Sequence, residues 1–207
     1  MTALPAIVGT VGLLIAGAAQ AQPGRSGMST EARADNVSAF RELSAFGVCY
    51  ARFNRANALA LIATEAGSRE EGETFRRLIS GEQNCVLPGT MRGSLIYFRG
   101  VIAEGLLSAR ESLPAELVLA APTVEQVRNL HDVARYYVSG HRSQAQTVLA
   151  TRTGSQEETA AIAAIWSDVR ACFPPTLNVR LNAPWVRFLL AEALLRTGTM
   201  PRPAAGS

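Results

Sequence analysis

Apolar side chains recur at helical spacing along most of this chain. One run is Val37, Phe40, Leu43 and Phe46, and a later run is Val124, Val127, Leu130 and Val133. Positions three residues apart stay on one face of an α-helix for a few turns, so both runs predict amphipathic helices. Sustained two-residue alternation and Asn-Gly hairpin signals, which would indicate strands, do not occur in the sequence. We therefore predict an all-α fold.

The two runs belong to a long internal repeat. Residues 36–90, shifted by 87 positions, are identical to 123–177 at 15 of 55 positions, and residues 91–107, shifted by 88, match 179–195 at 6 of 17. Matches this numerous and this well ordered indicate two copies of one helical unit. About 75 residues alone bury little apolar surface. We therefore expect the internally duplicated four-helix units to form one pseudo-symmetric helical domain rather than two lobes, although the sequence leaves that choice open.

Each copy is predicted to hold four helices. These are 36–53, 55–65, 69–82 and 91–109 in the first copy, and 124–139, 142–152, 156–171 and 182–197 in the second. The expected division of the chain is a signal peptide at 1–21, a flexible lead-in at 22–34, repeat 1 at 35–110, a connector at 111–122, repeat 2 at 123–198 and a disordered tail at 199–207. Thr123, with Gln126 three residues later, is the predicted N-cap of the second copy.

The best-preserved motif of the repeat has the chemistry of a turn between two helices. It reads Ala-Thr-x-x-Gly-Ser-x-Glu-Glu at 63–71 and again at 150–158. Glycine readily adopts the left-handed conformation that ends a helix. The serine is expected to cap the following helix, with the glutamate three residues later completing a capping box. Adjacent glutamates on a helix point in different directions, so the motif favours capping over an acid/base pair.

The N-terminus predicts export. Residues 1–21 hold no charged side chain, and Ala19-Gln20-Ala21 has the small residues that a signal peptidase accepts, so we expect cleavage before Gln22. The apolar stretch is shorter than the roughly 20 residues that span a bilayer, which argues against an uncleaved anchor. A periplasmic or secreted protein without a stable membrane span is expected.

Charge excludes one class of partner. The net charge is +3, and all 20 basic residues are arginines scattered along the chain. Nucleic-acid binding requires a stronger and more clustered positive charge, so no nucleic-acid partner is expected.

The three cysteines predict one disulfide bond. Exported proteins commonly form disulfides, and Cys49 and Cys85 lie in the same copy. Cys172 matches Cys85 in the repeat, but the residue that matches Cys49 is Tyr136. We therefore expect a Cys49–Cys85 bridge and a free, buried Cys172.

Motifs for catalysis, metals and cofactors do not occur in the sequence. There is no Cys-x-x-Cys, His-Glu-x-x-His, glycine-rich phosphate loop or Gly-x-Ser-x-Gly. The only histidines, His131 and His141, are not near a cysteine in the sequence. We therefore assign no catalytic residue, no metal ligand and no cofactor.

Charged residues within apolar helices are the one chemically distinctive feature. Glu104 and Glu192 lie in apolar stretches, and each follows an arginine by five positions. The candidate ligand-binding residues are Glu104, Glu192, Arg99, Arg187, Arg55 and Arg142. One interpretation is that each glutamate pairs with an arginine of its own copy, as a buried carboxylate requires. The other is that the two clusters line a cleft for a small anion.

The chain resembles a group of exported, all-helical bacterial proteins with an internal duplication and no assigned activity. The resemblance is carried by Phe46-Gly47-x-Cys49-x-Ala51-Arg52, the Gly67-Ser68 turn, Cys85 and the segment 99–107. It implies export and paired cysteines, and it assigns no catalytic residue.

Three functions remain open at this level. The leading hypothesis is an exported helical protein that binds a protein partner, a cell-envelope component or a second copy of itself. The alternative is an exported all-α enzyme with a cofactor-free Arg/Glu pocket that acts on a small anionic substrate, and the third is a purely structural envelope protein.

Overall fold

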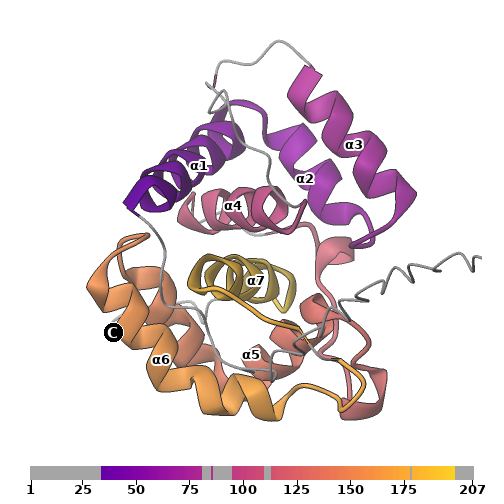
Figure 1. Cartoon of the computed structure of the whole chain (residues 1–207). Helices are drawn as coiled ribbons and strands as arrows, with labels where there is room; N and C mark the ends of the chain where they lie inside the picture. The colour runs from indigo at the N-terminus through magenta and orange to yellow at the C-terminus, as the bar shows by residue number, and fades with distance from the viewer. Residues whose placement is uncertain (1–33, 81–84, 86–94, 110–112, 178, 199–207) are drawn as a thin grey trace, which may run out of the picture.

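The computed structural model describes residues 34–80, 85, 95–109, 113–177 and 179–198 (Figure 1). Within them lie α-helices, two short 3₁₀ helices and no strand, which confirms the all-α prediction. The helices are α1 (Ala34–Phe53), α2 (Arg55–Ala63), α3 (Arg69–Ser80), α4 (Leu95–Ser108), η1 (Ala115–Leu117), η2 (Val124–Gln126), α5 (Leu130–Ala150), α6 (Gln156–Ala171) and α7 (Ala183–Arg196). The predicted signal peptide, most of the lead-in and the tail lie outside the described residues.

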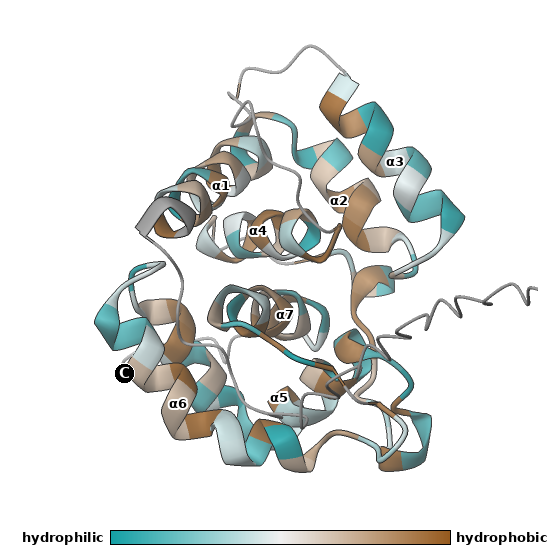
Figure 2. Cartoon of the chain, in the orientation of Figure 1, coloured by the Kyte–Doolittle hydropathy of each residue, from teal (hydrophilic) through white to brown (hydrophobic). Residues whose placement is uncertain are grey.

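The helices are arranged around a central pair. Figure 1 shows α4 and α7 side by side, with α1, α2 and α3 on the far side of α4 and α5 and α6 on the far side of α7. In Figure 2 the outer helix α3 carries many hydrophilic residues, whereas α2 and α4 show long apolar stretches. Phe188, Ala191 and Leu195 of α7 also pack into the hydrophobic core formed by α1, α2 and α4. The central pair therefore joins the two sets of outer helices.

Small residues allow the central helices to pack closely. A Cβ atom added to Gly105 would lie 2.2 Å from the carbonyl oxygen of Gly47, so α4 contacts the backbone of α1 at this point. A Cβ added to Gly100 would lie 2.7 Å from the Cα of Phe188, so α4 approaches the backbone of α7 as closely. Larger side chains at these positions would force the helices apart.

The two Gly-Ser corners have the predicted geometry. Gly67 and Gly154 have φ angles of 81° and 70°, the left-handed values that glycine adopts without strain. The Ser68 and Ser155 hydroxyls each accept a hydrogen bond, at 3.1 Å, from the backbone N–H of the glutamate three residues later. The caps of α3 and α6 are therefore confirmed.

The helical path also breaks at two positions that lie 87 residues apart. Asn54, between α1 and α2, has φ −129° and ψ 40°, and His141, inside α5, has φ −130° and ψ 36°. The predicted boundary between 124–139 and 142–152 is thus present as a kink within one continuous element.

The predicted cap at Thr123 is present, but the α-helix predicted to begin after it is not. Residues 124–126 form only a 3₁₀ turn, in which the N–H of Thr123 donates to the Gln126 side chain at 2.9 Å. The α-helix begins at Leu130, because the Asn129 side chain accepts a hydrogen bond from the N–H of Asp132 at 3.0 Å and caps it there. Val124, predicted to face the core, is 53% exposed.

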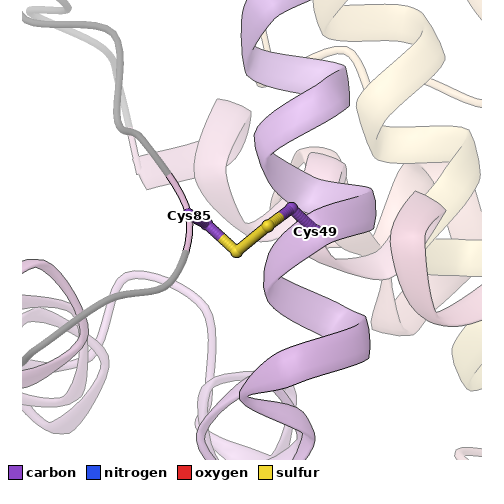
Figure 3. The surroundings of a disulfide bond; sticks show 2 residues. All are labelled: Cys49 and Cys85. Atoms are coloured by element: carbon purple, nitrogen blue, oxygen red, sulfur yellow. A yellow bond between two sulfur atoms is a disulfide. The ribbon is translucent and has the colours of Figure 1, made fainter.

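The predicted disulfide is present. Cys49 in α1 and Cys85 are joined, with their Cα atoms 5.8 Å apart (Figure 3). Cys172 is free and buried, as expected.

Replacing Gly105 by alanine is expected to destabilise the protein by about 1–3 kcal/mol, because the new methyl group would overlap the Gly47 carbonyl. Gly72→Ala is the matched control. Gly72 lies inside α3 with nothing within 4 Å of its added Cβ, so alanine there should stabilise by about 0.4–1 kcal/mol. Urea unfolding followed by circular dichroism measures both changes. Equal effects of the two substitutions would contradict the close α1–α4 contact.

Candidate functional site

Arg99 of α4 is fully buried and binds the corner between α2 and α3. Its Nη groups donate to the carbonyl oxygens of Leu61, Ile62 and Thr64 at 2.9–3.0 Å. These carbonyls belong to the end of α2, where backbone oxygens lack helical partners and the helix dipole favours a cation. Arg99 also donates to Glu71 of α3 at 3.3 Å and, through Nε, to Glu192 of α7 at 2.6 Å.

Arg187 of α7 makes the corresponding contacts with the corner between α5 and α6. It donates to the carbonyl oxygens of Val148, Leu149 and Thr151 at 3.1–3.2 Å and to Glu158 at 3.2 Å. Its Nη2 lies 2.5 Å from Oε1 of Glu104. In both corners the capping-box glutamate also accepts a hydrogen bond from the glycine N–H, at 2.7 Å for Glu71 and 2.6 Å for Glu158.

The predicted pairing within each copy is therefore wrong. Arg99 pairs with Glu192 and Arg187 pairs with Glu104, so each ion pair crosses between α4 and α7. A residue five positions earlier on a helix points to a different side from the glutamate, whereas the neighbouring helix brings its glutamate within reach. The two buried arginines therefore hold the central helices together as well as the corners.

Burial and nearby charge shift the pKa of Glu192, on a central helix, and that of Glu158, in a capping box, in opposite directions. Burial disfavours the charged form of Glu192, but the positive charges of His131 and Arg99 outweigh it and lower its pKa to about 2. For Glu158, burial dominates and the pKa is raised, although the Gly154 N–H and Arg187 oppose that shift.

An open cleft of about 550 Å³ lies beside the Arg99–Glu192 pair. Its walls come from the α2–α3 corner, the connector after η1, the start of α5 and the end of α7. The lining residues are Ala63, Thr64, Glu65, Ala66, Leu119, Ala120, Ala121, Pro122, Gln126, Arg128, Asn129, His131, Asp132, Arg135, Leu189, Glu192, Ala193 and Arg196. This volume lies within the range of about 300–1,000 Å³ typical of small-molecule sites.

Two residues of the cleft, His131 and Arg196, have polar side-chain atoms whose hydrogen-bonding capacity the described residues do not fill. His131 Nδ1 lies 2.6 Å from Oε2 of Glu192, and its side chain is 15% exposed. Arg196 is 8% exposed, yet its Nη1 reaches only Thr64 O at 3.4 Å and Glu192 Oε1 at 3.8 Å. Its Nε is buried without a hydrogen-bond partner among the described residues. Burial and the nearby charge of Arg99 lower the pKa of Arg196.

The corresponding place beside Arg187 is covered. Arg41 of α1 donates to the carbonyl oxygens of Thr153 and Gly154 at 3.0 and 3.3 Å, and Ser44 lies 3.2 Å from the Thr153 hydroxyl. A Cβ added to Gly154 would lie 2.4 Å from Val37, whereas one added to Gly67 would have nothing within 4 Å. The first turns of α1 thus pack on the α5–α6 corner, and no helix of the described residues covers the α2–α3 corner in the same way.

A helix cap explains this difference. The Asn129 side chain caps Asp132, and the Asp132 carboxylate accepts from the N–H of Arg128 at 3.1 Å, so the helix begins late. The positions 87 residues earlier hold Glu42 and Ala45, which lack this cap, and α1 continues through them. The missing helical turns before Leu130 leave the cleft open.

The structure separates the predicted site residues. Glu192 lines the cleft and Arg99 lies behind it, whereas Glu104 and Arg187 form the covered cluster. Arg142 binds the end of α7, donating to Thr197 and the Leu194 carbonyl at 3.2 and 3.4 Å, and Arg55 begins α2. Neither of these two arginines lines the cleft.

Sequence reasoning missed His131, Arg135 and Arg196. The candidate residues were selected because they recur at the repeat shift, and these three do not recur. The positions 87–88 residues earlier hold Ser44, Val48 and Ser108. The cleft residues therefore lie at positions where the two predicted copies differ in sequence, and that difference is the signal that could have identified them.

Comparison with protein-family models, with curated proteins and with solved structures produces no match to this chain. Among the described residues, no helix is both long and apolar enough to cross a membrane. No group of three or more metal-ligating side chains occurs in the same part of the chain.

Arg99→Met is expected to destabilise the protein by about 3–5 kcal/mol, because it removes the buried cation that binds Glu71, Glu192 and several helix-end carbonyls. Arg69→Met is the control: the Arg69 side chain is 91% exposed and pairs only with Glu73, so the change should cost less than about 1 kcal/mol. Denaturant unfolding of both variants tests the difference. A loss below about 1 kcal/mol for Arg99→Met would show that the buried network does not stabilise the fold.

The low pKa of Glu192 predicts acid sensitivity. The pKa is about 2 in the folded protein against an ordinary value of 4.5, so the ionised group stabilises the fold above about pH 4.5. That contribution is lost as the pH falls from 4.5 towards 2. The free energy of unfolding of the wild type should therefore fall more steeply between pH 5 and pH 2 than that of Glu192→Gln. Parallel pH profiles would contradict the assignment.

Proposed function

We propose that the protein is an exported helical binding protein whose ligand is a small anion held in the cleft. The supporting observation is the state of Arg196. A guanidinium this deeply buried normally has a close counter-ion and several hydrogen bonds, as Arg99 and Arg187 do. Arg196 has one long hydrogen bond, a distant carboxylate and a buried Nε without a partner among the described residues. A carboxylate or phosphate in the cleft would supply what this guanidinium lacks.

We further propose that the fold arose by duplication and that the residues lining the cleft became specialised for function after it. Several features recur at the 87–88-residue shift: the two corner glycines, the two kinks and the crosswise Arg–Glu pairs. Features needed only for folding would be retained in both copies. His131, Arg135 and Arg196 occur in one copy and line the cleft, which favours a role in binding.

Export is part of the proposal. The Cys49–Cys85 bridge supports it, because disulfides persist in the periplasm and outside the cell and are rare in reducing compartments. The charge-free N-terminal segment, which lies outside the described residues, supports it independently from the sequence.

A small ligand is favoured over a protein partner by the shape of the site. The charged groups lie along a cleft of small-molecule size rather than on a flat or protruding face. A protein or envelope partner, a second copy and a purely structural role remain the competing classes.

Binding of succinate, citrate and inorganic phosphate to the mature protein should be measured by thermal shift and isothermal titration calorimetry. At a ligand concentration 100 times its Kd, the expected stabilisation is about 2.7 kcal/mol, or a Tm rise of roughly 5–10 °C. Arg196→Met should abolish this rise, whereas Arg69→Met, on an exposed side chain outside the cleft, should retain it.

Two results would contradict the proposal. One is that none of the anions shifts the Tm at millimolar concentration. The other is a shift of the same size in wild type and Arg196→Met, which would indicate anion binding elsewhere on this arginine-rich surface.

A further inference from the structure

We propose that His131 is a general base and that the cleft hydrolyses esters of small carboxylate-bearing acids. This inference rests on the proposed anion site, since that site would hold the substrate carboxylate. It adds a reaction to the binding role and assigns each participating group a task.

The imidazole of His131 is held by a rigid chain of contacts. Its Nδ1 lies 2.6 Å from Oε2 of Glu192, and the other oxygen of Glu192 accepts from Nε of Arg99 at 2.6 Å. Because Arg99 is fully buried and anchored to the α2–α3 corner, the carboxylate cannot readily rotate away. An ionised carboxylate at Nδ1 requires the proton on that nitrogen, so the neutral ring carries its lone pair on Nε2. Glu192 is therefore a positioning residue for His131.

The lone pair of Nε2 is not used by the fold. His131 lines the cleft, and Nε2 makes no hydrogen bond within the described part of the chain. Arg135 and Arg196 line the same cleft. Arg135 is paired with Asp132 at 2.5 Å, whereas the carboxylate of Glu192 lies 3.8 Å from Arg196, so Arg196 has positive charge available for an oxyanion or a substrate carboxylate. At the matching position of the other copy, Ser44 is 3.2 Å from Thr153 in a covered contact, and no base is present there.

This set of groups suffices for acyl transfer to water. Nε2 takes a proton from a water molecule as the water oxygen adds to the ester carbonyl carbon, and the carbonyl electron pair moves to its oxygen. That oxyanion is stabilised by the neighbouring guanidinium groups. The carbonyl then re-forms, the ester C–O bond breaks, and the leaving alkoxide takes the proton from the imidazolium. The products are an acid and an alcohol, and water is the only co-reactant.

The lining of the cleft favours a short acyl group. Small apolar residues from the α2–α3 corner and the connector form part of the wall, namely Ala63, Ala66, Ala120, Ala121 and Pro122. A hemiester of a short dicarboxylic acid would place its methylene groups against these residues and its free carboxylate near Arg196.

The test uses the mature protein with 4-nitrophenyl hydrogen succinate as the anionic probe and 4-nitrophenyl acetate as the neutral one. We expect a higher kcat/KM for the anionic ester and a rate that falls on acidification. His131→Gln should lower kcat about 100-fold or more, since general-base catalysis typically contributes 10²–10⁴-fold. The matched control is His141→Gln, because His141 is the only other histidine, stacks on Tyr137 and does not line the cleft.

Two further variants separate the roles. Glu192→Gln should lower kcat with little change in KM and alter the pH profile, because an amide no longer fixes the proton on Nδ1. Arg196→Met should raise KM for the anionic ester much more than for the neutral ester, because only the anionic ester presents a carboxylate to this guanidinium.

The outcomes also distinguish this inference from the proposed function. Anion binding without hydrolysis, or equal rates in wild type and His131→Gln, would overturn the catalytic role and leave the binding protein intact. His131 lies at the edge of the cleft with a 15% exposed side chain, so its variant is expected to fold even if Glu192→Gln does not. Absence of both binding and hydrolysis would overturn both proposals.

Discussion

The fold depends on placing a buried arginine against the end of a helix. Arg99 and Arg187 each donate hydrogen bonds to backbone carbonyls at a helix C-terminus. Each also pairs with a capping-box glutamate and with a glutamate from the neighbouring central helix. A buried guanidinium without these partners would be strongly destabilising, so the corner, the cap and the α4–α7 pair must form together. The close glycine contacts at Gly100 and Gly105 bring α4 near enough to α7 and α1 for this to happen.

One corner is covered by a helix and the other is open, and a small change in helix capping accounts for the difference. The first turns of α1 lie on the α5–α6 corner, whereas Asn129 and Asp132 delay the start of α5 and leave the α2–α3 corner exposed to the cleft. Under the proposed duplication and the proposed function, the place of a structural contact in one copy would be a binding surface in the other. A buried Arg–Glu pair is present behind both the open corner and the covered one.

The open corner changes the electrostatic role of Glu192. Among the described residues Glu104 pairs with Arg187, whereas Glu192 pairs with Arg99, contacts His131 and lies near Arg196. Its positively charged surroundings keep the pKa of Glu192 low, and burial together with the charge of Arg99 lowers the pKa of Arg196. The proposed binding of an anion and the proposed role of the oriented imidazole thus depend on the same local arrangement.

The sequence alone determined the features that depend on neighbours a few residues apart. Apolar spacing, the Gly-Ser corners and their caps indicated the helices, and cysteine pairing within one copy indicated the disulfide. The cap at Asn129, which begins α5, was not predicted, because the internal repeat favoured a longer helix there. Only the tertiary structure decided that each buried glutamate pairs across the central helices and that His131 and Arg196 meet in a cleft. The physical reason is range. Caps and turns involve atoms within four residues, whereas the partners of Arg99 and His131 lie 93 and 61 positions away and are selected by how closely the helices pack.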